Sequence, residues 1–193
     1  MRMIVTLLVT GIFTSNLVTS NLLGLDSLQS DNRTSTLSVL KNGLVVTAVL
    51  LLSAALCYPL NSLVLSPLKL DYLVPFAFVL VIFGVFMLLY LTAQKFSPKA
   101  FDFLKQNIKW QSVALIALGL CLIALEHEVV TGYAVALVYA VICGVGYTAV
   151  SLIFFAINQR LEATKLPESA KGLPITLLIA ALISLAFGGL AGL

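Results

Sequence analysis

Residues 133–157 read YAVALVYAVICGVGYTAVSLIFFAI, a continuous apolar run without a charged side chain. An α-helix rises 1.5 Å per residue, so about 20 such residues cross the roughly 30 Å hydrocarbon core of a bilayer. Because the run is apolar throughout, rather than at every second residue, it favours a helix over a strand of a membrane barrel. It therefore predicts a transmembrane helix.

Similar apolar runs lie on both sides of this one. Of the 193 residues, 61% are hydrophobic and 10% are charged, whereas a soluble domain carries about a quarter charged residues. The fold class predicted is an all-α integral membrane protein of one domain with six transmembrane helices. The other five runs are Met3 to Leu25, interpreted as a retained span rather than a cleaved signal peptide, Gly43 to Leu60, Tyr72 to Leu91, a fourth ending near Leu125, and Leu173 to Leu193.

The basic residues predict the orientation. With six spans, one side of the membrane holds only Arg2 and Lys69. Because cytoplasmic loops are rich in Lys and Arg, both termini are expected outside the cytoplasm. The cations lie between apolar runs, so the membrane rather than nucleic acid is the expected partner. The other side holds Arg33, Lys41, Lys95, Lys99, Lys105, Lys109, Arg160, Lys165 and Lys171.

The first and fourth runs are interrupted by polar residues. In the fourth, the uninterrupted part from Val113 to Leu125 covers only about 20 Å, so a full crossing requires residues 101–112 as well. The first run is also interrupted by polar residues. Its polar residues are Thr14, Ser15, Asn16, Thr19, Ser20 and Asn21.

These two interrupted segments open the two halves of the chain, about residues 1–95 and 96–193. With three spans in each half, the second half is inverted relative to the first, and matched interruptions in inverted halves point to a functional site at the bilayer midplane. Asn16, Asn21 and Gln111 are the polar candidates for it. The alternative is that such side chains only hydrogen-bond between helices.

Other motifs predict packing rather than chemistry. Cys57, Cys121 and Cys143 each lie inside an apolar run and are interpreted as buried small side chains. Glu126-His127-Glu128 is interpreted as a solvated turn, so no catalytic or metal-binding residue is assigned. Small residues four apart predict close helix packing in the fifth and sixth runs: Ala136, Ala140, Gly144 and Thr148, and Ala180, Ser184, Gly188 and Gly192.

Three stretches together resemble the Rnf/Nqr family of membrane subunits, of the RnfA/NqrE type. They are SNLVTSNLLGL at 15–25, GVGY at 144–147, and QRLEATKLPESAKGLPITLLIAALISLAFGGLAGL at 159–193. The resemblance covers the whole chain. It implies a six-helix inverted-repeat subunit in a bacterial cytoplasmic (inner) membrane. It also implies an RnfE/NqrD-like homologue of opposite orientation as partner, in a complex that couples ferredoxin or NADH oxidation to sodium or proton movement.

In this family the interrupted helices each contribute one cysteine to a 2Fe-2S cluster shared with the partner. The family's first cysteine follows LGL, where this chain has Asp26, and the second falls at Ser112, preceded by Gln111. Thiolates are the usual ligands of such clusters, so both cluster ligands are expected to be lost. Cys121 lies about two and a half helical turns beyond Ser112, too far to replace it.

The leading hypothesis is therefore a membrane subunit of an ion-translocating electron-transport complex, without catalytic residues of its own. Two alternatives remain open at this point. One is a stand-alone carrier with a site lined by Asn16, Asn21, Gln111 and Ser112. The other is a membrane scaffold without its own activity.

Overall fold

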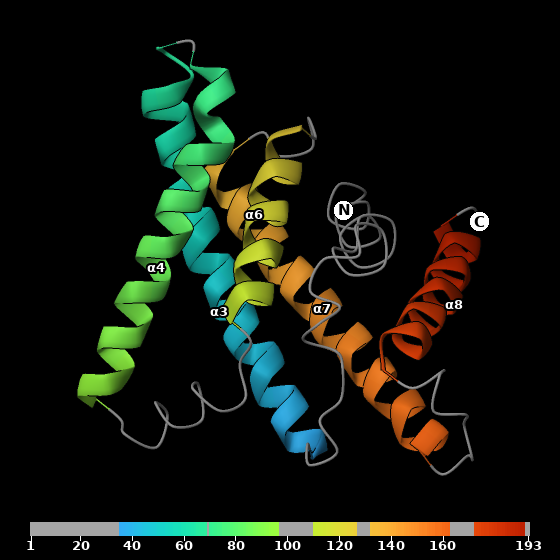
Figure 1. Ribbon diagram of the computed structural model, residues 1–193. Helices are drawn as coiled ribbons and strands as arrows, with labels where there is room; N and C mark the ends of the chain where they lie inside the picture. Colours follow the sequence, from blue (N-terminus) through green and yellow to red (C-terminus); the bar gives the residue numbers. More distant parts are fainter. Residues whose placement is uncertain (1–34, 69, 97–109, 127–131, 163–171, 192–193) are drawn as a thin grey trace.

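Five helices make up the part of the chain that the computed structural model describes, residues 35–68, 70–96, 110–126, 132–162 and 172–191 (Figure 1). These residues contain no strand, so the predicted all-α class is confirmed. The predicted first span, Met3 to Leu25, lies outside them, and the full set of six spans stays a prediction. The helices are α3 (Thr36–Leu60), α4 (Val74–Phe96), α6 (Trp110–Glu126), α7 (Tyr133–Glu162) and α8 (Leu173–Ala191).

The helix ends differ from the ends of the apolar runs because a helix continues beyond the membrane where its ends are capped. Helix α3 begins seven residues before the predicted start at Gly43. At its N-terminus the Ser35 side chain accepts a hydrogen bond from the Ser38 amide, at 3.3 Å. Such a cap satisfies an amide that has no partner within the helix. After Pro59, the helix passes into a π turn, Asn61–Leu65.

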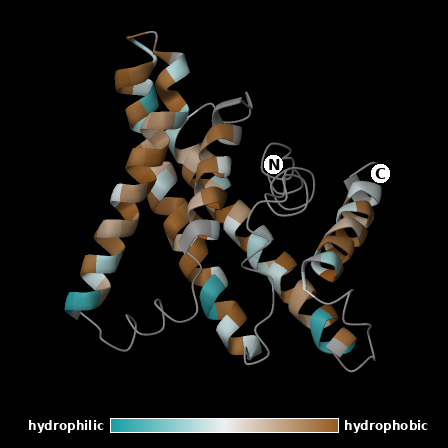
Figure 2. Cartoon of the chain, in the orientation of Figure 1, coloured by the Kyte–Doolittle hydropathy of each residue, from teal (hydrophilic) through white to brown (hydrophobic). Residues whose placement is uncertain are grey.

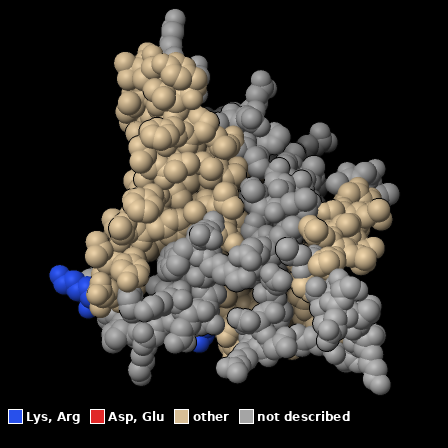
Figure 3. All heavy atoms as spheres, in the orientation of Figure 1, with Lys and Arg blue, Asp and Glu red and all other residues tan. Residues whose placement is uncertain are grey.

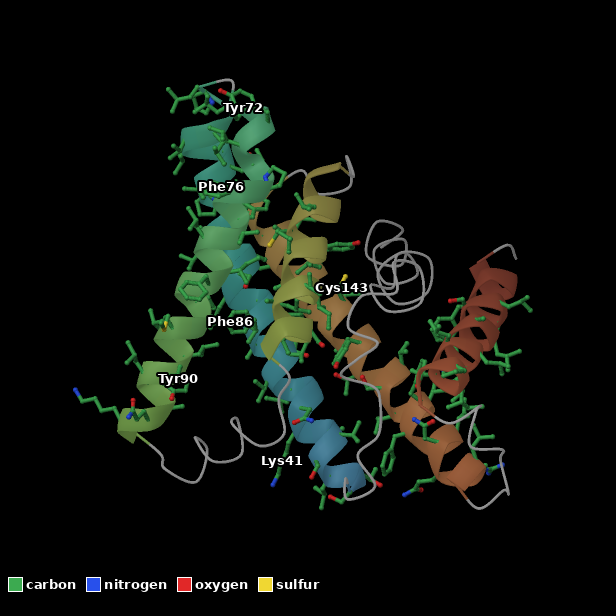
Figure 4. The ribbon with its side chains drawn as sticks, viewed as in Figure 1. Lys41, Tyr72, Phe76, Phe86, Tyr90 and Cys143 are labelled. Carbon is green, nitrogen blue, oxygen red and sulfur yellow. The ribbon has the colours of Figure 1, made fainter. Side chains whose placement is uncertain are left out.

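Successive helices run in opposite directions (Figure 1). Helices α3, α6 and α8 run one way, and α4 and α7 return. Lys41 lies near the start of α3, whereas Lys95 and Arg160 lie in the last turns of α4 and α7, so these three cations share one end of the helix bundle. In Figure 4, Lys41 lies at this end and Tyr72 at the opposite end. The exposed cations in Figure 3 likewise lie at the lower end, away from the uncharged helix surfaces.

The helix surfaces are apolar over most of their length (Figure 2). Within the described residues, three helical segments are long and apolar enough to cross a membrane: Thr36–Leu65, Val74–Lys95 and Tyr133–Leu161. Helices α6 and α8 contain shorter apolar stretches, Ser112–Leu122 and Pro174–Gly189. Large side chains such as Leu44, Phe76 and Leu185 are more than 60% exposed, which suits contact with lipid rather than water.

Helix α3 lies at the centre of the bundle and packs against α4, α6 and α7. Its buried side chains Val46, Val49 and Leu50 join the main core cluster with residues from α6, α7 and α8. Phe154 of α7 and Ile116 of α6 are fully buried in the same cluster. The contact of α3 with α7 is the largest between any two described helices, so this crossing organises the fold.

Candidate functional site

Ser112 is the one predicted site residue whose side chain the structure describes. It lies in the first turn of α6, is 3% exposed, and precedes the buried Val113. Gln111 belongs to the same turn, but its side chain is outside the described part. Asn16, Asn21 and Asp26 also lie outside the described residues. Their predicted meeting with Ser112 therefore remains a prediction.

The centre of the structure is a close crossing of α3 and α7 through two glycines. A Cβ atom placed on Gly43 would lie 2.5 Å from Thr148 Oγ1 and 2.9 Å from Thr148 Cβ. A Cβ atom placed on Gly144 would lie 2.5 Å from Thr47 Oγ1 and 2.8 Å from Thr47 Cβ. Each threonine thus fills the space that a side chain on the opposing glycine would need.

Both threonine hydroxyls are satisfied within their own helix. Thr47 Oγ1 donates to the Gly43 carbonyl and Thr148 Oγ1 to the Gly144 carbonyl, each at 2.8 Å. A hydroxyl bonded to the carbonyl four residues earlier needs no partner across the interface. The threonines can therefore pack against the glycines without leaving a polar group unsatisfied in an apolar environment.

The two contacts are related by approximate two-fold symmetry. Gly43 faces Thr148 while Thr47 faces Gly144, so the order of contacts is reversed and the two helices cross antiparallel. Reciprocal contacts of this kind are the mark of a two-fold axis between two copies of one element. At this crossing, α3 and α7 are equivalent elements.

A short sequence repeat accompanies this symmetry. Residues 43–51 read GLVVTAVLL and residues 144–152 read GVGYTAVSL, which share the pattern Gly-x-x-x-Thr-Ala-Val-x-Leu. Burial follows the same register. Val49 and Val150 are each 0% exposed, whereas Leu52 and Ile153 are 37% and 39% exposed. This repeat lies in the second and fifth apolar runs, which are uninterrupted. The polar residues that interrupt the first and fourth runs therefore gave no sign of it.

The predicted small-residue face is confirmed on α7 and holds only in part on α8. In α7, Ala136 and Ala140 are buried at 4% and 0%, and Gly144 contacts Thr47. In α8, Ala180 is 1% exposed, but a Cβ on Gly188 would meet nothing within 4 Å. Spacing alone does not show which part of a small-residue face meets another helix.

All three cysteines are buried and free, as the sequence predicts. Cys57 of α3 and Cys121 of α6 lie together with Leu65, Val74 and Phe78 in a second core cluster. They also line a cavity of about 20 Å³, room for about one water molecule. The other lining residues are Ala54, Tyr58, Phe78, Leu120, Ala136 and Tyr139.

The Ser112 position does not fit a thiolate-ligated cluster. Its side chain is a buried hydroxyl, and α6 continues as one helix from there to Cys121, roughly 13 Å along the axis. No group of three or more His, Cys, Asp or Glu side chains suited to a metal occurs among the described residues. Within that part, the arrangement supports helix packing rather than catalysis.

Comparison with known proteins gives matches over almost the whole chain. The family described as "Rnf-Nqr subunit, membrane protein" matches residues 4–193. The A subunit of the Na(+)-translocating ferredoxin:NAD(+) oxidoreductase complex of Acetobacterium woodii is 29% identical over 187 residues, 97% of this chain and 96% of the relative. The A subunit of an ion-translocating oxidoreductase complex from Syntrophotalea carbinolica is 30% identical over 195 residues, 100% and 98% of the two chains. Its counterpart from Yersinia enterocolitica is 33% identical over 151 residues, 78% and 77%.

Proposed function

The chain belongs to the Rnf-Nqr family of membrane subunits, and we propose that it serves as the A-type subunit of an ion-translocating electron-transport complex. The observation that carries this proposal is the match to such subunits across nearly the full length of both chains. The apolar helices of the fold agree with a subunit embedded in the membrane. The chain itself contributes helices and an ion path, and the redox chemistry is carried by the assembled complex.

The two halves, about residues 1–95 and 96–193, form inverted repeats in this proposal. The reciprocal Gly43–Thr148 and Gly144–Thr47 contacts support it, since α3 and α7 are then the second helices of the two halves. The first and fourth segments open the halves and supply Asn16, Asn21 and Gln111 to a polar path at the midplane. Inverted repeats in transporters meet at such a midplane site.

The subunit lies in the bacterial cytoplasmic membrane with both termini outside the cytoplasm. Lys41, Lys95 and Arg160, at one end of the bundle, support the cytoplasmic placement of that end. Reporter domains fused within residues 66–70 and 163–171 test this arrangement. We expect the first reporter outside and the second inside, and reporters on the same side would contradict both the orientation and the inversion.

The partners are an opposite-orientation homologue and the other members of the complex. The family's cluster ligands are lost at Asp26 and Ser112, and the hydroxyl of Ser112 is buried where a thiolate would be required. An assembly that carries Ser112→Ala should therefore keep the iron content of the unmodified assembly. A loss of iron would show that Ser112 is a ligand.

Affinity purification of the tagged chain from its native membranes tests the proposed role in a complex. We expect the membrane-embedded homologue and the subunits that bear redox cofactors to co-purify in fixed proportion. The same chain with Gly84→Ala should co-purify with the same partners, because a Cβ on Gly84 meets nothing within 4 Å. A functional chain that purifies alone would instead support the stand-alone carrier.

A further inference from the structure

The two buried cysteines near one end of the bundle form a pair. Cys57 is 2% exposed and Cys121 is 4% exposed, and they come from neighbouring helices, α3 and α6. Their side chains lie next to one another. Both belong to one core cluster and line one cavity. The pair is therefore a defined two-thiol site rather than two separate core residues.

The surroundings of the pair are apolar and leave room for movement. Ala54 and Ala136 are small, and the cavity beside the thiols measures about 20 Å³. None of its lining residues carries an acidic or basic side chain. Both thiols therefore border a small apolar space.

Two chemistries are open to a pair of thiols, and the apolar surroundings distinguish them. A soft metal ion such as Cu(I) binds thiolates, and two thiolates with one monovalent cation leave a net negative charge in an apolar site, which is costly. A disulfide is neutral and leaves no charge to be solvated. We propose that Cys57 and Cys121 form a reversible disulfide that joins α3 to α6. This proposal does not require the proposed role in a complex, but it rests on the membrane orientation proposed with that role.

The oxidation requires an apolar two-electron acceptor, because the buried thiols are closed to water-soluble oxidants. The acceptor is a membrane-soluble quinone. Each thiol loses its hydrogen, the S–S bond forms, and the two electrons and two protons convert the quinone to a quinol. The pair lies toward the end of the bundle opposite to Lys41, where the orientation proposed above gives the oxidising, extracytoplasmic side.

The test uses the complete chain in its membranes and a fully substituted quinone, decylubiquinone, which does not add to thiols. After treatment, the chain is denatured and alkylated with a maleimide, and the mass of the intact protein is measured by mass spectrometry. Because the chain has three cysteines, we expect the number of alkylated cysteines per chain to fall from three to one. A thiol-free phosphine reductant should restore three labels, and oxidised glutathione, which is polar, should leave three.

Cys143 supplies the matched control, since it is also buried but lies on α7, away from the cavity that Cys57 and Cys121 line. After quinone treatment, the number of labels on the Cys143→Ser chain should fall from two to none. The Cys57→Ser and Cys121→Ser chains should each keep two labels. A disulfide-linked peptide pair that contains Cys57 and Cys121, isolated from the unmodified chain, tests the proposal without any variant. Three labels after quinone treatment, a linkage through Cys143, or equal oxidation by glutathione would overturn the proposal.

Discussion

Gly144→Ala is expected to reduce the ratio of folded to unfolded protein by about 5- to 150-fold, because overpacking of a close contact costs about 1–3 kcal/mol. The new Cβ would lie 2.8 Å from Thr47 Cβ, an atom next to the backbone that cannot rotate away. Helices α3 and α7 would then have to separate at the centre of the fold. Thermal unfolding of the purified protein in detergent measures the loss.

The symmetry of the crossing makes this prediction specific. Gly43→Ala should have an effect of similar size, because its Cβ meets Thr148 in the same way. Gly84→Ala, on α4, should leave stability unchanged, since it meets nothing within 4 Å.

A compensating substitution tests the contact itself. Thr47→Gly should restore stability to the Gly144→Ala protein, because it removes the three atoms that lie nearest to the new Cβ. Thr148→Gly should restore the Gly43→Ala protein, but not the Gly144→Ala protein. If either threonine substitution rescued both alanine variants equally, the two reciprocal contacts would not exist as described.

The all-α class could be predicted from the sequence because it depends on local composition. Long apolar runs predict helices that cross a membrane, and α7 begins at Tyr133, as its run predicts. Helix α3 begins at Thr36, seven residues before the predicted apolar run at Gly43, because Ser35 caps a more polar turn that precedes the run.

The contacts between helices could not be predicted in the same way. Cys57 and Cys121 are each typical of buried core residues, and nothing local indicates that they meet, since the meeting depends on how α3 and α6 pack. The Gly43–Thr148 crossing is an intermediate case. Its repeated Gly-x-x-x-Thr-Ala-Val pattern is present in the sequence, but the reciprocal contact follows only from the antiparallel crossing of α3 and α7.

The polar site proposed at the midplane could be predicted only as a set of candidate residues. Ser112 is buried at the start of α6. Its predicted neighbours Asn16, Asn21 and Asp26 lie outside the described residues. Their meeting across the two halves depends on tertiary packing, which residue type and spacing do not determine.

Loss of the chain should abolish redox-driven ion transport by the complex. A membrane subunit that forms part of the ion path cannot be bypassed by the redox subunits, because ions do not cross the hydrocarbon core unaided. Inverted membrane vesicles from cells that lack the chain should accumulate neither sodium nor protons when the redox substrates of the complex are supplied. Complementation with the unmodified chain or with Gly84→Ala should restore uptake, and complementation with Gly144→Ala should restore less of it.

The most direct test of the central claim is ion uptake by these vesicles, with reduced ferredoxin and NAD(+), the substrates named for the Acetobacterium woodii complex, supplied together. Labelled sodium and a pH-sensitive dye report the two candidate ions in the same preparation. The proposed role predicts uptake only when the chain and both redox substrates are present. Uptake that is equal with and without the chain, or that proceeds through the purified chain alone without any redox substrate, would contradict it.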